Sequence, residues 1–218
     1  MELWHGTHNN FLVDETKNEI HKKDIIKYSK KYKVDGIIIV NLISKNLIKM
    51  KFYNPDGSLD NCGNGLRVAV KYFYDKDYIK KNGEIISLEQ TFRYSIKDNK
   101  ITIEFKSVNI SKKNKIWNIG GVPHRLYRVR SIEEFREKAR KLRDKYNVNI
   151  TLMREINNNI FAQTFEVGVE NFTYSCGTGS IAVALETKKS DIFMPGGLLK
   201  IRNEYKKVLL TGDAVKIK

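Results

Sequence analysis

The sequence predicts an α+β fold made of two pseudo-symmetric halves that face each other across a cleft. Two observations support this prediction. The order strands, helix, strands, cysteine-led helix, strands occurs in residues 1–110 and again in residues 115–218. The only two cysteines, Cys62 and Cys176, each open a Cys-Gly-x-Gly phrase that runs into an apolar, helix-forming stretch. Because the polar stretch 109–115 separates the repeats, we expect one domain at 1–114 and a second at 115–218.

Alternating apolar and polar residues predict short strands along the whole chain. The strands are expected at 36–40, 49–53, 85–88, 92–96, 101–105, 125–129, 149–153, 160–165, 198–201 and 208–210. Apolar periodicity predicts helices at 23–33, 66–75, 131–146 and 179–189. Asp98-Asn99 is typical of a hairpin turn, and Ser131 is expected to cap the third helix.

The composition is that of a globular protein able to bury a sizeable core, with 218 residues of which 41% are hydrophobic. The first residues, Met-Glu-Leu-Trp-His-Gly, contain no secretion signal, and no stretch approaches 18 apolar residues. We therefore expect a cytoplasmic protein without a membrane segment. Cysteines are reduced in that compartment, so a structural disulfide is a poor explanation for Cys62 and Cys176.

The net charge of +15 raises the question of a nucleic-acid partner. The basic residues are mostly lysines spread over the whole chain, and no arginine-rich arm, zinc ribbon or RNA-binding signature accompanies them. We therefore expect no specific nucleic-acid binding. The positive field instead favours anionic substrates.

The two cysteine phrases predict a pair of sulfur bases facing one carboxylate-bearing substrate. A thiol at a helix N-terminus is expected to have its pKa lowered towards neutrality by the helix dipole and by free amides. The glycines of Cys62-Gly63-Asn64-Gly65 and Cys176-Gly177-Thr178-Gly179 let the backbone approach an anion closely.

Two other interpretations of the cysteines stay open. A buried free cysteine is commonly a small hydrophobic residue and nothing more. Cys62 and Cys176 with His5 and His8 form a conceivable zinc site, but no Cys-x-x-Cys or His-x(3–5)-His spacing supports one, so we expect no metal.

Several further stretches occur in a fixed order along nearly the whole chain. They are 5–11 (His-Gly-Thr-His-Asn-Asn-Phe), 54–58 (Asn-Pro-Asp-Gly-Ser), 62–67, 147–150 (Asn-Val-Asn-Ile), Glu166 with Thr173 and 176–179, 195–197 and 210–212. Together they resemble the diaminopimelate epimerase family, whose members invert an amino-acid α-carbon without a cofactor. The resemblance implies two strongly curved mixed or antiparallel sheets, each around a central helix, with no cofactor and no metal.

The resemblance also implies a division of labour in the site. One cysteine, as thiolate, would remove the α-proton and the other, as thiol, would return one to the opposite face. The backbone amides of Gly63, Asn64, Gly177 and Thr178 would hold the reacting carboxylate. Glu166 and Asn9 would hold the α-ammonium, and Asn54 and Asn147 would touch the distal part of the substrate. His124 is assigned either a supporting role or none, and Glu166 taken alone is typical of an exposed charge at a strand end.

The distal end of the expected site departs from the family pattern. Val167 stands where the family has an arginine, Val122 where it has an asparagine, and His8 where it has a glycine. Arg125, Arg67 or a lysine is a candidate to meet a second carboxylate. The default substrate is L,L-diaminopimelate, converted to the meso form. The alternatives are a racemase for an α-amino acid without a second amino-acid head, and a non-catalytic binding protein of the same fold. A homodimer is one option for its assembly.

Overall fold

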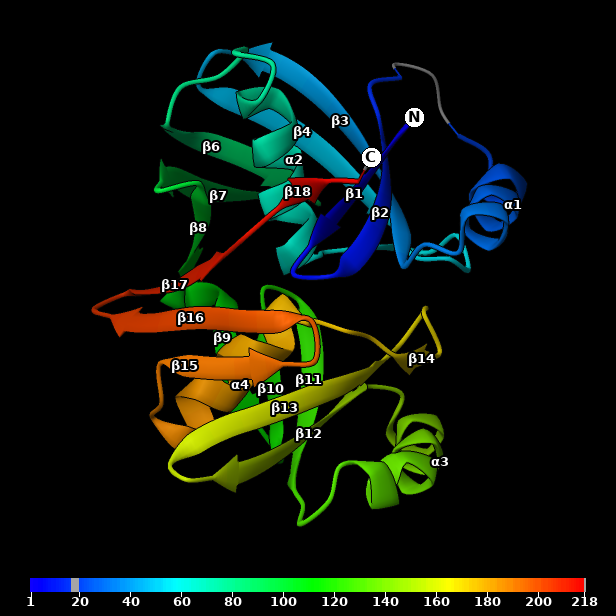
Figure 1. Ribbon diagram of the computed structural model, residues 1–218, viewed down its shortest axis with the longest axis vertical. Helices are drawn as coiled ribbons and strands as arrows, with labels where there is room; N and C mark the ends of the chain where they lie inside the picture. Colours follow the sequence, from blue (N-terminus) through cyan, green and yellow to red (C-terminus); the bar gives the residue numbers. More distant parts are fainter. Residues whose placement is uncertain (17–19, 218) are drawn as a thin grey trace.

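The chain folds into two halves of the same architecture, stacked along the long axis of the molecule (Figure 1). A computed structural model describes residues 1–16 and 20–217. The first half contains β1 (Glu2–Gly6), β2 (Asn9–Asp14), α1 (Lys22–Tyr32), β3 (Gly36–Ser44), β4 (Leu47–Tyr53), β5 (Leu59–Asp60), α2 (Gly63–Tyr74), β6 (Asn82–Ser87), β7 (Gln90–Lys97) and β8 (Lys100–Lys106). The second half contains β10 (Ile116–Ile119), β11 (Val122–Arg128), α3 (Arg136–Tyr146), β12 (Asn149–Ile156), β13 (Asn159–Glu166), β14 (Asn171–Phe172), α4 (Gly177–Thr187), β15 (Asp191–Met194), β16 (Gly197–Glu204) and β17 (Lys207–Gly212).

The strand pairing of the first half recurs in the second. In both halves the second strand pairs in parallel with the third, and the fourth pairs in parallel with the strand after the central helix. The other neighbours pair antiparallel, including β1 with β2 and β10 with β11. The predicted α+β fold with two pseudo-symmetric halves is therefore confirmed.

Three further pairings join the halves. β8 pairs with β17 at the centre of the molecule. The short strand β9 (Ile110–Lys113) follows β8 but pairs with β10, and β18 (Val215–Lys216) follows β17 but pairs with β1. Each half thus receives one outer strand from the end of the other. Because the sheet is continuous, the division at 114/115 stays a prediction.

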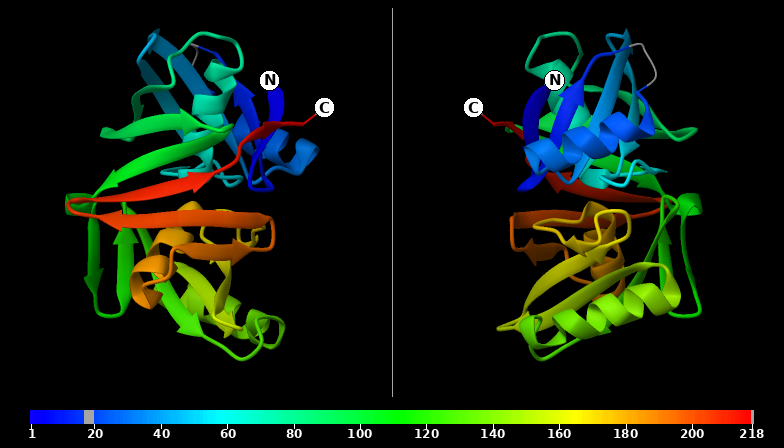
Figure 2. Two further views of the ribbon diagram at one scale, coloured as in Figure 1. Left: turned by 60° about the vertical axis from the view of Figure 1, so that its left-hand side comes forward. Right: turned by 90° about the vertical axis from the view of Figure 1, so that its right-hand side faces the viewer.

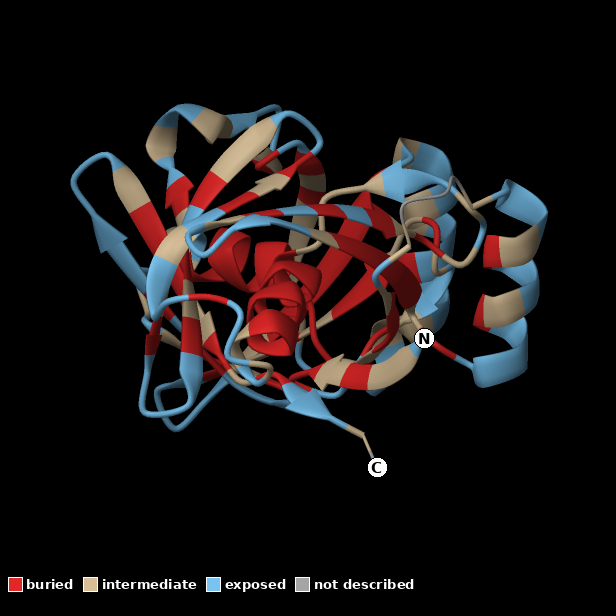
Figure 3. Cartoon of the chain, turned by 90° about the horizontal axis from the view of Figure 1, so that it is seen from above, coloured by how far each residue is buried: buried red, intermediate tan, exposed pale blue. Residues whose placement is uncertain are grey.

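The central helices α2 and α4 are buried inside the curved sheets (Figure 3). α4 carries apolar and small residues almost all round, which is the pattern of a helix enclosed by its own domain. In α2 the residues from Gly63 to Phe73 are all buried. Because each helix is packed on every side, its N-terminus is held in a fixed position.

The helices α1 and α3 lie on the outside of the sheets (Figure 2). Each buries little of itself: Ile25 and Ser29 in α1, and Ala139 in α3. Ile25 packs with Leu12 and Ile37, and Ala139 packs with Ile150 and other residues of β12 and β13. These equivalent clusters form a second, smaller core in each half, apart from the central helix.

The four predicted helices are present, with boundaries shifted by a few residues. The largest shift is in the third, where the 3-10 turn η2 (Glu133–Phe135) precedes α3. Ser131 accepts a hydrogen bond from the Glu134 amide at 3.3 Å and so caps this turn, not the α-helix. Asp98 and Asn99 form the β7–β8 turn with φ values of 48° and 57°. In the described part of the chain, no helix is long and apolar enough to cross a membrane.

Candidate active site

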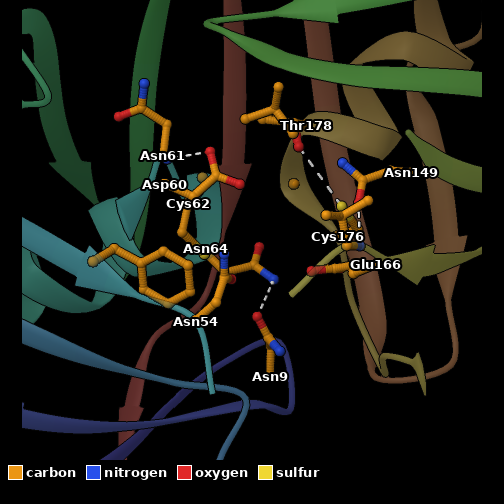
Figure 4. Close-up of a pocket in the computed structure, with 15 residues that line it drawn as sticks. Asn9, Asn54, Asp60, Asn61, Cys62, Asn64, Asn149, Glu166, Cys176 and Thr178 are labelled. Carbon is orange, nitrogen blue, oxygen red and sulfur yellow. Dashed lines mark hydrogen bonds between the residues drawn. The ribbon is translucent and has the colours of Figure 1, made fainter. Parts of the chain in front are cut away.

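The two cysteines occupy equivalent positions at the starts of the central helices. Cys62 is the N-cap of α2 (φ −132°, ψ 109°) and Cys176 the N-cap of α4 (φ −135°, ψ 111°). Both line one pocket between the halves (Figure 4). The first turns of the two helices touch, because a β-carbon added to Gly63 would lie 3.5 Å from the Cα of Gly177.

Nine of the sequence-predicted site residues line this pocket. They are Asn9, Asn54, Cys62, Gly63, Asn64, Glu166, Cys176, Gly177 and Thr178. Val122 and Val167, the two departures from the family pattern, line it as well. The pocket therefore gathers residues from both halves, although their roles in chemistry stay predictions.

Four lining residues were missed from the sequence: Phe52, Asp60, Asn61 and Asn149. Asp60 and Asn61 immediately precede Cys62, and their position beside the cysteine was the available signal. Asn149 was within reach of the same reasoning, since it follows Asn147 by two residues.

The prediction for Asn147 is corrected by the structure. Asn147 is exposed and caps the C-terminus of α3 in the left-handed conformation, with φ 49°. Asparagine tolerates this conformation well, which explains its place there. Asn149 lines the pocket instead, where its side chain accepts a hydrogen bond from the Val167 amide (2.8 Å) and donates one to the Pro123 carbonyl (3.1 Å).

The expected lowering of the cysteine pKa values is also corrected. Burial raises the pKa of Cys62 to about 12 and that of Cys176 well above its ordinary value, and the negative charge of Glu166 adds to both shifts. The helix amides act in the expected direction: the Gly65 amide donates to the Cys62 sulfur at 3.3 Å. In the ligand-free pocket they are outweighed by the loss of water.

Glu166 lies at the end of β13 with its carboxyl group towards Cys176 (Figure 4). Burial is the largest cause that raises its pKa, to about 7, and the hydroxyl of Thr173, which donates to the carboxylate at 2.6 Å, opposes the shift. The negative charges of Asp35 and Asp60 raise the pKa further. The carboxylate is thus short of a cation, as an ammonium-binding group would be before its ligand arrives.

Asn64 connects the two halves beneath the pocket. Its amide nitrogen donates to the side chain of Asn9 (3.1 Å) and to the carbonyl of Ser175 (3.0 Å). Its side-chain oxygen accepts from Arg67 (2.9 Å), which is fully buried and also donates to Thr7 (3.0 Å).

Arg67 and Arg125, considered from the sequence as partners for a second carboxylate, do not line the pocket. Arg67 is engaged by Asn64 and Thr7, while the guanidinium of Arg125 lies 4.0 Å from the ring centre of Tyr146. None of the described lining residues is a lysine, an arginine or a histidine.

His124 lies behind the pocket wall as part of a buried hydrogen-bonded chain. Its Nε2 is 2.9 Å from the hydroxyl of Thr178 and its Nδ1 is 3.1 Å from that of Thr151. Burial lowers the pKa of His124 to about 3, so the ring is neutral near pH 7. Because the Thr178 hydroxyl also lies 3.6 Å from the Cys176 sulfur, His124 is placed to support the start of α4 without touching a substrate.

The pocket is closed. Its open space measures about 20 Å³, which is room for about one water molecule. An amino acid needs far more, so the halves must separate for it to enter. Elsewhere in the described chain, no group of three or more His, Cys, Asp or Glu side chains is arranged to hold a metal ion.

Comparison with known proteins agrees with this geometry. No family model matches the chain. The diaminopimelate epimerase of Thermotoga maritima is 31% identical over 224 residues, covering 94% of this chain and 94% of that protein. The diaminopimelate epimerase of Nitratiruptor sp. is 29% identical over 202 residues, covering 84% of this chain and 80% of that protein.

Solved structures share the fold at low identity. A putative phenazine biosynthesis PhzC/PhzF protein from Clostridium difficile matches with a TM-score of 0.73 at 12% identity, covering 100% of this chain and 96% of that one. A hydroxyproline epimerase from Agrobacterium vitis matches with a TM-score of 0.68 at 9% identity, covering 100% and 90%. The identity to the Thermotoga protein over nearly the full length of both chains shows that this chain belongs to the diaminopimelate epimerase family and is, as a member, an amino-acid epimerase, an isomerase.

Proposed function

We propose that Cys62 and Cys176 invert the α-carbon of an amino acid by transferring protons on its two faces. The observation that carries this proposal is that both thiols line one pocket at the starts of two helices that touch at Gly63 and Gly177. A carboxylate held between these helix starts receives hydrogen bonds from first-turn amides, which have no partner within their own helix. The same amides stabilise the negative charge that develops when the α-proton leaves.

The proton balance of the reaction closes on the two sulfurs. One cysteine enters the cycle as thiolate and takes the α-proton, leaving a carbanion stabilised by the carboxylate and the amides. The other enters as thiol and delivers its proton to the opposite face. After turnover the two sulfurs have exchanged protonation states, so the enzyme is ready for the reverse direction.

The substrate itself supplies part of the activation. The high pKa values of the thiols come from burial and from the charge of Glu166. An α-ammonium placed beside Glu166 neutralises that charge, which removes one of the two causes and favours the thiolate. Opening of the halves admits the substrate, and closing excludes water from the charged intermediate.

The first substrate to test is L,L-diaminopimelate, since the Thermotoga and Nitratiruptor relatives are named for it. The product would be the meso form. Val122 and Val167 in the pocket lining favour testing a second candidate, an α-amino acid with a single amino-acid head.

The test is incorporation of deuterium from D₂O at the α-carbon, measured for the native protein and for Cys62→Ser and Cys176→Ser. Each substitution keeps the shape of the side chain but gives a much weaker base, so we expect incorporation to fall by about 10²-fold or more. Thermal unfolding of each variant controls for misfolding.

Two results would contradict the proposal. Retention of native exchange rates in both serine variants would rule out the thiols as bases. Binding of amino acids without any exchange in the native protein would identify a non-catalytic binding protein on the same fold.

A further inference from the structure

The strand registers show which residues of the pocket are equivalent in the two halves. Ile37 lies between Leu12 and Tyr53 in the first half, as Ile150 lies between Arg125 and Phe165 in the second. Counted along the strands from these positions, Asn9 at the start of β2 corresponds to Val122 at the start of β11. In the same way, Asn54 after β4 corresponds to Glu166 at the end of β13.

The pocket therefore has two sides related by the pseudo-symmetry. Asn9 and Glu166 form the near side, where the α-ammonium is expected. Val122 and Asn54 form the far side, where the rest of the substrate must lie. The exchange of a carboxylate for an amide and of an amide for a valine makes the far side a poor match for a second amino-acid head.

The far side has an acid of its own, at a different position. Leu59 pairs with Tyr53 as Phe172 pairs with Phe165, so Asp60 corresponds to Thr173. On the near side Thr173 donates a hydrogen bond to the acid Glu166. On the far side the order is reversed, because Asp60 is the acid and the side chain of Asn54 hydrogen-bonds to it.

Asp60 is fixed in place by its neighbours. It accepts a hydrogen bond from the Asn61 amide at 2.7 Å, and Asn61 donates from its side chain to the Gly120 carbonyl at 2.8 Å. Gly120 belongs to the other half, next to the strand that begins at Val122. Figure 4 shows the Asp60 carboxyl group turned into the pocket.

The charges of the pocket are consequently unbalanced. Asp60 and Glu166 supply one carboxylate from each half, and the described lining contains no cationic side chain. Glu166 is met by the α-ammonium and the helix amides meet the α-carboxylate, which leaves Asp60 without a positive partner. Burial raises the pKa of Asp60, as expected for a carboxylate that lacks one. A second carboxylate on the far side would face Asp60 with no cation to offset the repulsion.

We propose that Asp60 determines specificity and selects an α-amino acid whose far end is an amine without a second carboxylate, as in lysine or ornithine. This inference rests on the proposed function and names the substrate class of the same site. Phe52, Val122 and Val167 supply apolar surface for the methylene groups between the two ends. The far amine pairs with Asp60 as the α-ammonium pairs with Glu166.

The first experiment compares four amino acids in the deuterium-exchange assay: L-lysine, L-ornithine, L-norleucine and L,L-diaminopimelate. Norleucine has the length of lysine without its far nitrogen atom. We expect kcat/KM for lysine or ornithine to exceed that for norleucine and for diaminopimelate by roughly 30-fold or more, the effect of an added partner for a buried charge.

The second experiment compares Asp60→Asn with the control Asp98→Asn. Asp98 lies in the exposed β7–β8 turn, so its substitution makes the same change in charge far from the pocket. We expect Asp60→Asn to abolish most of the ratio between lysine and norleucine, while Asp98→Asn keeps it. A third readout is calorimetric binding of the same ligands to the double variant Cys62→Ser/Cys176→Ser, which does not depend on turnover.

The outcomes separate this inference from the proposed function. Turnover that is best with diaminopimelate, or equal for lysine and norleucine, overturns the inference and leaves the two-cysteine mechanism standing. Absence of exchange with all four, together with tight binding of lysine that Asp60→Asn weakens, overturns the mechanism and supports the role of Asp60. Absence of both exchange and selective binding overturns both.

Discussion

Gly63 and Gly177 pack against each other where the first turns of α2 and α4 meet. A β-carbon on Gly177 would lie 3.3 Å from the carbonyl carbon of Gly63 and 2.9 Å from a methyl group of Leu210. Two helix starts can come this close only when both residues lack side chains. The contact places two sets of first-turn amides on one point, and that convergence gives the pocket its affinity for a carboxylate.

We expect Gly177→Ala to lower kcat/KM by roughly 10²-fold, since an added methyl group forces the helix starts apart and misplaces the reacting carboxylate. Gly63→Ala is the graded comparison, because its β-carbon would lie 3.1 Å from Leu210 and 3.5 Å from Gly177. Its loss should be smaller. Equal losses would mean that the ranking by contact distance is wrong, and native activity in Gly177→Ala would mean that the close approach is not required.

The pKa of Glu166 predicts how stability depends on pH. Its folded-state pKa is raised to about 7 from 4.5 in the unfolded chain. The carboxyl group therefore contributes stability that is fully present below pH 4.5 and is lost as the pH rises through 7. Glu166→Gln removes this loss, so the variant should be more stable than the native protein by up to about 3 kcal/mol at pH 8, with little difference near pH 4.5.

Urea unfolding at both pH values measures this difference, and Glu89→Gln, an exposed turn residue, is the control. The same substitution should lower activity and remove the rise of kcat/KM through pH 7 that ionisation of Glu166 causes. A Glu166→Gln variant that is less stable than the native protein at pH 8 would contradict the assignment.

Oxidation is expected to join Cys62 to Cys176 and stop activity. The two sulfurs must approach opposite faces of one carbon atom, and in the closed pocket little else separates them. Mild oxidant should cause the loss of two hydrogen atoms in the mass spectrum, and a thiol reductant should restore activity. Two free thiols with full activity after oxidation would contradict the geometry, and Cys62→Ser serves as the control that cannot close.

Much of this site follows from local sequence signals. A Cys-Gly-x-Gly phrase before an apolar stretch identifies a helix start, and two such phrases in a repeated order of elements place both starts at one cleft. These features are local or periodic, so the sequence displays them directly. The fold and the family follow from the same features.

The errors concern properties that depend on the whole structure. The lowering of the cysteine pKa was expected from the helix start alone, but burial, which no motif records, has the larger effect. Asn147 and Asn149 differ only in strand register, and the left-handed cap claims the first of them. Asp60 in a polar loop resembles an ordinary surface acid until strand pairing places it opposite Asn54's counterpart, Glu166.

The buried ring of His124 yields the last prediction. Its pKa is lowered from 6.5 to about 3, so it contributes stability that is present above pH 6.5 and is lost as the pH falls through 3. His124→Leu leaves the hydroxyls of Thr151 and Thr178 without their partner, which should cost about 2 kcal/mol at pH 8. By pH 5 the native protein should itself lose about 2 kcal/mol, because its unfolded state then binds a proton that the folded ring refuses, and the gap should nearly close. Urea unfolding at pH 8 and 5 measures the gap, with His21→Leu at the exposed start of α1 as the control. An unchanged gap at the two pH values would mean that the ring is protonated in the folded protein.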